Sequence, residues 1–184
     1  MKLLVTGGAG FLGSHFIRAW LTHHPSDEVV ALDVLTYAGS RARLAEAEGS
    51  GRCRFIHGDI CDPALVRTLM RSCQAVAHFA AETHVDRSIT DAAPFLRTNV
   101  EGTYTLLREA AACEVSRFIH ISTDEVYGPV LDGAVDESAP LAPRSPYAAS
   151  KAAGDLLVQA VRATYQLPAI VVRPTNVFGP WQFP

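Results

Sequence analysis

Residues 3–13 read LLVTGGAGFLG, a short apolar run that ends in regularly spaced glycines. A continuous run of this kind is typical of a strand that is buried on both faces. Gly7, Gly10 and Gly13 follow it, and helical periodicity begins at Phe11. A glycine turn between a strand and a helix lets the backbone approach a diphosphate, whose charge is favoured by the free N–H groups at the helix N-terminus. The stretch therefore predicts a nucleotide-binding start to the domain.

An acidic residue completes this pattern. Asp33 lies twenty residues after Gly13, at the end of the second apolar run. A carboxylate at this place accepts hydrogen bonds from an adenosine ribose and repels a 2′-phosphate. Strand, glycines, helix and acid together favour a Rossmann dinucleotide site over a purely structural glycine turn, and they favour NAD over NADP. Arg41 and Arg43, which lie nearby in the sequence, oppose the preference for NAD.

The rest of the chain alternates short apolar runs with longer stretches of helical periodicity. This βαβα order predicts an α/β fold with a doubly wound parallel sheet, a Rossmann fold. Three segments rich in turn formers or charges are expected to be loops: residues 82–91, 128–145 and 174–184. Strands are expected at residues 3–6, 29–33, 53–57, 75–79, 117–122 and 169–173, and helices at residues 11–23, 41–48, 63–71, 94–113 and 147–165.

Composition excludes several classes of protein. The chain has 184 residues, a formal net charge of −3 and 48% hydrophobic residues, which suits one compact domain and not a disordered or coiled-coil protein. It has no cluster of Lys and Arg, so neither a nucleic acid nor a membrane is an expected partner. No apolar run approaches the ~18 residues that a membrane span requires. The N-terminus becomes glycine-rich too early for a signal peptide.

The cysteines and histidines predict no metal site. Cys53, Cys61, Cys73 and Cys113 have no CxxC spacing, and no histidine pair has the HExxH spacing. Reduced thiols are the default of a cytoplasmic protein, and the protein is expected to be cytoplasmic.

Tyr147 and Lys151, in the stretch YAASK, are candidates for proton transfer. At a separation of four residues on a helix, the two side chains share one face. A nearby ammonium stabilises a phenolate and lowers the pKa of the tyrosine, so that it can deprotonate an alcohol. This spacing is common by chance, and an exposed helix pair is the alternative. Its place after a dinucleotide pattern and after the fifth apolar run favours the catalytic interpretation.

The stretch STDEVYG, residues 122–128, places Thr123, Asp124 and Glu125 at the end of the fifth predicted strand. Adjacent acids in a loop are usually only solvated. Beside a Tyr/Lys pair, however, one carboxylate can remove a carbon-bound proton while the other protonates a leaving hydroxyl. That reaction is the elimination of water, made feasible once oxidation has placed a ketone beside the C–H bond.

Six motifs together resemble one known family. They are the glycine pattern, DVLTYAG at 33–39, AAETHVD at 80–86, TNVEGT at 98–103, STDEVYG and YAASK. The chain resembles the extended short-chain dehydrogenase/reductase superfamily, and within it the nucleotide-sugar 4,6-dehydratases. The resemblance implies bound NAD and an enzyme, a lyase, that converts an NDP-glucose, with dTDP-glucose favoured, to an NDP-4-keto-6-deoxyglucose.

The resemblance also implies roles for the reacting residues. Tyr147, with Lys151 and Thr123 beside it, takes the proton from the sugar C4 hydroxyl as hydride moves from C4 to NAD. Glu125 then removes the C5 proton, and Asp124 protonates the departing C6 hydroxyl. Hydride returns to C6 as a proton is delivered to C5, so the cofactor ends as it began.

Binding residues follow from the same resemblance. Thr98 or Asn99 is expected near the active site. The sequence departs from the family pattern at Thr83, Val177 and Phe178, which leaves the nucleotide and sugar contacts open. Expected cofactor-binding residues are Gly7, Gly10, Phe11, Leu12, Gly13, Asp33, Asp59, Ile60, Ala80, Ala81, Thr98, Tyr147 and Lys151, and expected substrate-binding residues are Glu82, His84, Arg87, Thr123 and Asn176.

Members of this family carry a second, mostly C-terminal domain that holds the nucleotide of the substrate. Residues 1–173 are therefore expected to form the NAD-binding domain with its catalytic residues. Residues 174–184 are expected to begin a substrate domain that is mostly absent from this chain, which is then a fragment of a longer enzyme. A homodimer is expected through the helices at 94–113 and 147–165.

Two other functions stay open. An NDP-sugar 4-epimerase or decarboxylase would keep the fold and change the reaction, and the acid pair at Asp124 and Glu125 argues against it. A non-catalytic NAD-binding module, acting as a sensor or regulatory subunit, would suit the missing domain. The presence of Thr123, Tyr147 and Lys151 argues against that function.

Overall fold

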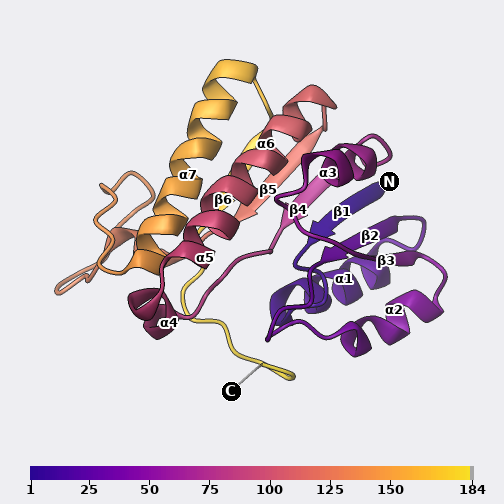
Figure 1. Cartoon of the computed structure of the whole chain (residues 1–184), viewed down its shortest axis with the longest axis horizontal. Helices are drawn as coiled ribbons and strands as arrows, with labels where there is room; N and C mark the ends of the chain where they lie inside the picture. Colours follow the sequence, from indigo (N-terminus) through magenta and orange to yellow (C-terminus); the bar gives the residue numbers. More distant parts are fainter. Residues whose placement is uncertain (183–184) are drawn as a thin grey trace.

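The computed structural model describes residues 1–182, and over this range the chain forms a parallel sheet with helices on both faces (Figure 1). The strand order is β3-β2-β1-β4-β5-β6, and every neighbouring pair is parallel. This confirms the predicted fold class. Each strand begins and ends within one residue of its predicted bounds. The strands are β1 Lys2–Thr6, β2 Glu28–Asp33, β3 Cys53–His57, β4 Ala75–His78, β5 Arg117–Ile121 and β6 Ala169–Val172.

The central strands are apolar throughout because both of their faces are covered. In β1, Leu4 points into a core with residues of α3, α6 and α7, whereas Leu3 and Val5 point into a second core under α1. A strand alternates its side chains between the two faces of a sheet, so a strand covered on both sides needs apolar residues at successive positions. The layered arrangement brings the carboxyl ends of all the strands to one edge, where the loops meet.

The two longest helices begin at positions that the sequence marks. At the start of α7, the Ser145 hydroxyl accepts a hydrogen bond from the Ala148 N–H at 3.0 Å, and Pro146 occupies the first turn. α1 begins directly after Gly10, as predicted. The helices are α1 Phe11–His23, α2 Ala45–Gly49, α3 Pro63–Met70, α4 Val85–Thr90, α5 Ala93–Phe95, α6 Thr103–Ala112 and α7 Pro146–Tyr165, with 3₁₀ turns at Arg41–Leu44 and Asp124–Tyr127 and a π-helical segment at Leu96–Gly102.

One predicted loop is wrong in part. Residues 82–91 contain α4, a helix of six residues whose N-cap His84 makes no side-chain capping bond among the described residues. The helix depends on a tertiary contact: the Ser88 hydroxyl donates to Val85 O at 2.6 Å and accepts from the Tyr147 N–H at 3.1 Å. A helix that short is not stable by itself, so local sequence gives little signal for it.

Two other expectations concern the helix at residues 94–113 and the loops at 128–145 and 174–184. The helix expected at residues 94–113 is present, but its first half is α5 and the π-helical segment before α6 begins at Thr103. The loop expected at residues 128–145 is confirmed, and residues 174–179 are also irregular, with a turn at 180–181. Residues 183–184 of the last predicted loop lie outside the described part of the chain.

Candidate active site

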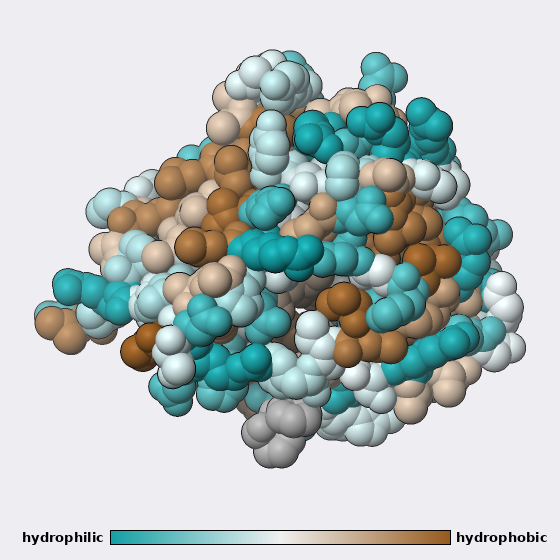
Figure 2. All heavy atoms as spheres, viewed as in Figure 1, coloured by the Kyte–Doolittle hydropathy of each residue, from teal (hydrophilic) through white to brown (hydrophobic). Residues whose placement is uncertain are grey.

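A cavity of about 910 Å³ lies at the carboxyl ends of the strands, and the surface is hollowed there near the middle of Figure 2. Its walls come from segments that follow all six strands. Among the described residues that line it, the predicted ones are Gly7, Gly10, Phe11, Leu12, Gly13, Asp33, Asp59, Ile60, Ala80, Ala81, Glu82, His84, Thr98, Thr123, Asp124, Glu125, Tyr147 and Asn176. Two predicted site residues, Lys151 and Arg87, lie outside this lining.

The glycine turn after β1 has room only for glycine. Gly7 has a φ of +67°, and a Cβ there would lie 2.6 Å from the Ala80 nitrogen. A Cβ on Gly13 would lie 2.2 Å from the Gly7 carbonyl oxygen, which accepts a hydrogen bond from Gly10 at 3.0 Å. Because the N-cap Gly10 has no side chain, the start of α1 faces the cavity with backbone N–H groups. This geometry suits a diphosphate.

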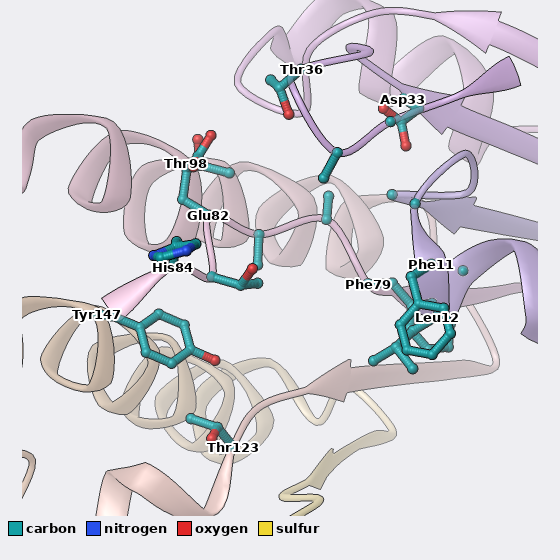
Figure 3. Close-up of a pocket in the computed structure, with 18 of the residues that line it drawn as sticks. Phe11, Leu12, Asp33, Thr36, Phe79, Glu82, His84, Thr98, Thr123 and Tyr147 are labelled. Carbon is teal, nitrogen blue, oxygen red and sulfur yellow. The ribbon is translucent and has the colours of Figure 1, made fainter. Parts of the chain in front are cut away.

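Asp33 holds two turns together at the far end of the cavity in Figure 3. Its carboxylate accepts from the Ala9 N–H at 3.0 Å and from the Leu35 N–H at 2.8 Å. Of the two arginines that opposed a preference for NAD, Arg41 pairs with Glu48 at 2.9 Å. Arg43 donates to the carbonyls of Ala38 at 2.6 Å and Ala9 at 3.2 Å, so its positive charge stays beside the glycine turn.

The loop after β3 forms another part of the cavity wall. Asp59 pairs with Arg97 at 2.7 Å and accepts from the Cys61 N–H at 2.8 Å. Ile60 is buried against Gly102, where a Cβ would lie 2.6 Å from the isoleucine side chain. Thr98 in the π-helical segment completes this wall.

Glu82 and His84 enter the cavity from the loop after β4 (Figure 3). The backbone of Glu82 is held on both sides by Asn99, whose amide side chain accepts from the Glu82 N–H and donates to the Glu82 carbonyl, each at 2.9 Å. One carboxylate oxygen of Glu82, Oε2, is buried and has no hydrogen-bond partner among residues 1–182. Burial raises the pKa of this carboxyl, and Arg87 opposes the shift. An uncompensated acceptor in a cavity wall is suited to a ligand's donor.

The remaining predicted substrate residues differ in place. Asn176, in the segment after β6, lines the cavity. Arg87 instead stacks its guanidinium on the Tyr37 ring, 4.0 Å from the ring centroid. This contact connects α4 with the loop after β2.

Residues Asp124–Tyr127 form a 3₁₀ turn directly after Thr123, which we call the acid turn. Thr123 caps it: the hydroxyl accepts from the Glu125 N–H at 3.2 Å and donates to Asp124 Oδ1 at 3.3 Å. Tyr147, from the first turn of α7, lies beside Thr123 in Figure 3, and Thr123 acts to lower the pKa of its phenol. The structure thus brings the predicted base and the predicted acid pair to one end of the cavity.

The electrostatics of Tyr147 differ from the prediction. Burial, with a smaller contribution from the carboxylates of Glu125 and Asp124, raises the pKa of the phenol to about 12, and Thr123 opposes this rise. The expected lowering by Lys151 is therefore wrong for this conformation. Lys151 donates its ammonium to the Ile121 carbonyl at 2.6 Å, on the strand side of α7.

Two further pKa shifts mark the site. Burial lowers the pKa of Lys151 to about 8, and Asp155 on the next turn of α7 opposes this shift. Burial also raises the pKa of Glu125, and the neighbouring carboxylate of Asp124 adds to the rise. Glu125 lines the cavity, and a perturbed pKa there is typical of a group that exchanges protons with a ligand.

Among residues 1–182, no group of three or more His, Cys, Asp or Glu side chains could hold a metal ion. No helix in the described range has the length and apolar character to cross a membrane.

Comparisons with known proteins agree with this geometry. Residues 3–184 match the family model described as the NAD dependent epimerase/dehydratase family. The chain is 52% identical over 188 residues to a dTDP-glucose 4,6-dehydratase of Streptomyces niveus, with 100% of this chain and 56% of that protein covered. The chain therefore spans a little over half the length of this curated relative.

Two solved structures have the same fold. One is the dTDP-glucose 4,6-dehydratase DesIV of Streptomyces venezuelae with NAD bound: the TM-score is 0.96 at 53% identity, with 99% of this chain and 58% of that chain covered. The other is a UDP-glucuronic acid 4-epimerase of Bacillus cereus in complex with UDP-glucuronic acid and NAD, with a TM-score of 0.93 at 33% identity, covering 99% of this chain and 59% of that chain. Both a dehydratase and an epimerase thus resemble the chain in structure.

Proposed function

The chain belongs to the NAD-dependent epimerase/dehydratase family, and from this premise we propose that it dehydrates an NDP-glucose, with dTDP-glucose favoured, to an NDP-4-keto-6-deoxyglucose. The acid pair carries the proposal: Asp124 and Glu125 line the same cavity as Tyr147, on a turn capped by Thr123. Oxidation of an alcohol needs one base, whereas elimination of water also needs a base for a carbon-bound proton and an acid for the leaving hydroxyl. On this proposal the protein is a lyase.

NAD is the proposed cofactor, and the cavity fits it. The glycine turn leaves space for a diphosphate at the start of α1, and Asp33 lies where an adenosine ribose would be bound. A bound NAD⁺ would supply an acceptor for the C4 hydride of the sugar and, once reduced, a hydride donor for C6, with a proton delivered to C5. The residues proposed to hold the cofactor are Gly7, Gly10, Phe11, Leu12, Gly13, Asp33, Asp59, Ile60, Ala80, Ala81, Thr98, Tyr147 and Lys151.

The first proton transfer is assigned to Tyr147. Its phenol removes the proton of the C4 hydroxyl, and the neighbouring Thr123, which acts to lower the pKa of the phenol, favours this step. Lys151 lies one turn further on the same helix and provides a buried positive charge on that side of α7. A base that is buried keeps one orientation, which favours transfer to a single hydroxyl.

The acid turn is assigned the elimination. Glu125 removes the C5 proton, and its raised pKa makes it a stronger base than an ordinary glutamate. Asp124 protonates the departing C6 hydroxyl. Glu82, His84, Thr123 and Asn176 are proposed to bind the sugar nucleotide from the cavity wall, and Arg87 to do so from its place beside Tyr37 at the end of the cavity.

The division into regions, the assembly and the compartment are also proposals. Residues 1–173 are assigned to cofactor binding and catalysis, and residues 174–184 to the start of the substrate-binding region. A homodimer is supported by apolar residues exposed on neighbouring helical faces: Leu96 is 55%, Tyr104 46% and Leu156 56% exposed. Sedimentation equilibrium would test the dimer, which a monomer at working concentration would exclude. The four cysteines are free thiols, as in a cytoplasmic protein.

Mass spectrometry tests the reaction. The chain, and a version extended past Pro184, would be incubated with NAD⁺ and a panel of NDP-hexoses deuterated at C4. Loss of one water with the deuterium kept, now at C6, is the expected result, because the hydride is carried from C4 to C6 on the same enzyme.

Three other results would contradict the proposal. An isomer of unchanged mass would identify an epimerase. This is the second candidate function, because the Bacillus cereus epimerase has a similar structure. Loss of carbon dioxide from a uronic acid substrate would identify a decarboxylase. If even the extended version binds NAD and changes no sugar, a non-catalytic module is the better description.

A further inference from the structure

Arg173 lies directly after β6 and makes contacts that connect three separate parts of the fold. Its side chain is 11% exposed. Nε donates to Asp155 Oδ2 at 2.8 Å, and Nη1 donates to the Tyr127 hydroxyl at 2.5 Å. Nη1 also reaches the Glu137 carbonyl in the loop after the acid turn, at 3.4 Å. One guanidinium therefore contacts α7, the acid turn and the following loop.

The partners of Arg173 belong to the two elements that carry the reacting groups. Asp155 is on α7, one turn after Lys151 and two turns after Tyr147. Tyr127 is the last residue of the acid turn, two residues after Glu125. The base of the first step and the acid pair of the second are thus on different elements, and the Arg173 side chain contacts both of these elements.

The backbone next to Arg173 adds to this connection. Its neighbour Pro174 accepts a hydrogen bond from the Asp124 N–H at 3.1 Å, so the acid turn is attached to the same segment at its first residue. At its last residue, the acid turn is attached to Arg173 itself, whose Nη1 donates to the Tyr127 hydroxyl. The acid turn is only four residues long, and these two contacts fix both of its ends.

Stability alone does not account for this arrangement. Burying an ion pair such as Arg173–Asp155 gives no more stability, on average, than apolar residues of similar size, because both charges lose their hydration. Asp155 is fully buried, and its other oxygen, Oδ1, has no hydrogen-bond partner in the described part of the chain. An apolar replacement would lose the directed hydrogen bonds, because the planar guanidinium holds its N–H donors in fixed directions.

We propose that Arg173 is a positioning residue, which holds the acid turn against α7 so that Glu125 and Asp124 reach the same sugar as Tyr147. This inference rests on the proposed dehydration and deepens it. It separates two halves of the reaction: oxidation at C4 needs Tyr147 in place, whereas elimination across C5 and C6 also needs the acid turn in place.

The variant Tyr127→Phe tests the proposal with the smallest change. It removes the hydroxyl that accepts from Arg173 and leaves the aromatic ring and the Arg173–Asp155 pair. Tyr165→Phe is the matched control, because Tyr165 is 66% exposed at the end of α7. Arg173→Lys is the second variant: it keeps the positive charge near Asp155 and cannot donate in both directions as the guanidinium does.

The readout is the partition between oxidation and elimination in a single turnover with an NDP-hexose in heavy water. We expect Tyr127→Phe and Arg173→Lys to slow incorporation of deuterium at C5 by about 10- to 100-fold, since displacement of a catalytic group by about 1 Å costs rates of this order. Formation of the reduced cofactor, measured by its absorbance, should change less than threefold. Tyr165→Phe should change neither rate.

Hydrogen exchange of the cofactor-free chain gives a readout independent of turnover. The amides of Asp124 and Gly128, bonded to Pro174 and Glu125 respectively, should exchange at least tenfold faster in Tyr127→Phe than in Tyr165→Phe. If the parent dehydrates its sugar and neither the partition nor this exchange changes, Arg173 is not a positioning residue. If both rates fall equally together with the melting temperature, its role is structural, which also overturns the proposal. If the parent dehydrates no sugar, the proposed function fails, and the exchange result alone then shows whether Arg173 fixes the acid turn.

Discussion

Substituting Gly13 by alanine should weaken cofactor binding strongly without destroying the fold. The added Cβ would lie 2.2 Å from the carbonyl oxygen of Gly7 and 2.9 Å from its carbonyl carbon, whereas ordinary contacts begin at 3.4 Å. The next nearest atom is the backbone Cα of Gly8, at 3.0 Å. Since all three are backbone atoms, no side-chain rotation can relieve the overlap, and the turn itself has to move.

The size of the effect follows from what that movement breaks. The Gly7 carbonyl accepts the hydrogen bond from Gly10 that closes the turn, at 3.0 Å. Overpacking costs about 1–3 kcal/mol, and loss of one hydrogen bond costs about 1 kcal/mol. If the conformation that binds NAD is destabilised by about 3 kcal/mol, NAD binding becomes roughly 100-fold weaker.

Isothermal titration of the purified chain with NAD measures this loss. Gly49→Ala is the control, because a Cβ at Gly49, the last residue of α2, meets nothing within 4 Å. That variant should bind NAD as the parent does and should be as stable or slightly more stable. Circular dichroism would show that Gly13→Ala keeps its fold. If a folded Gly13→Ala variant binds NAD as tightly as Gly49→Ala, the backbone of this turn does not hold the diphosphate and the reasoning is refuted.

Four other results are expected. Glu125→Gln cannot accept the C5 proton, so water loss should slow by about 100-fold or more while reduced cofactor still forms. Product mass and cofactor absorbance, followed in one single-turnover experiment, measure these two steps. Full dehydration by this variant would show that the assignment of Glu125 is wrong. Because burial and Asp124 raise the pKa of Glu125, deuterium incorporation at C5 should fall, as the pH is lowered, at a higher pH than for an ordinary glutamate, and Asp124→Asn should move this fall to lower pH. An unmoved pH profile would exclude that coupling. Asp33→Ser removes the carboxylate that repels a 2′-phosphate and should raise the ratio of NADP to NAD affinity by about tenfold; an unchanged ratio in titration would place the ribose elsewhere. Ser88→Ala leaves the buried Tyr147 N–H without its acceptor and should lower the free energy of unfolding by about 1–3 kcal/mol, measured by urea denaturation against the exposed control Ser138→Ala.

The sheet and the glycine turn could be predicted because their causes are local in the sequence. Strands covered on both faces must be apolar at successive positions, and Val29 and Val30 in β2 indeed belong to opposite cores. The order of strands and helices then limits the topology. α4 has no such local cause: its six residues are held by Ser88, whose partner Tyr147 is far away in the sequence.

The site divides in the same way. Residues that follow directly from a strand end, such as Asp33 and Thr123, were predicted to line the cavity, because parallel strands bring their carboxyl ends to one edge. Asn99 and Arg173 instead make contacts with residues that are distant in the sequence. Asn99 binds the backbone of Glu82, and Arg173 binds Asp155 and Tyr127. Nothing in the neighbouring sequence specifies those partners, so their roles became visible only in three dimensions.

Lys151 makes the distinction sharpest. A helix returns to the same face about every 3.6 residues, so the spacing correctly predicts that Lys151 and Tyr147 share one side of α7. Which acceptor the ammonium reaches depends instead on how α7 packs on the sheet, and there the Ile121 carbonyl at the end of β5 lies 2.6 Å from Nζ. The pKa of Tyr147 accordingly responds to burial, Thr123 and the acid pair. Spacing on a helix therefore identifies which residues can act together, while the charge that each one feels is determined by the sheet edge on which the helix lies.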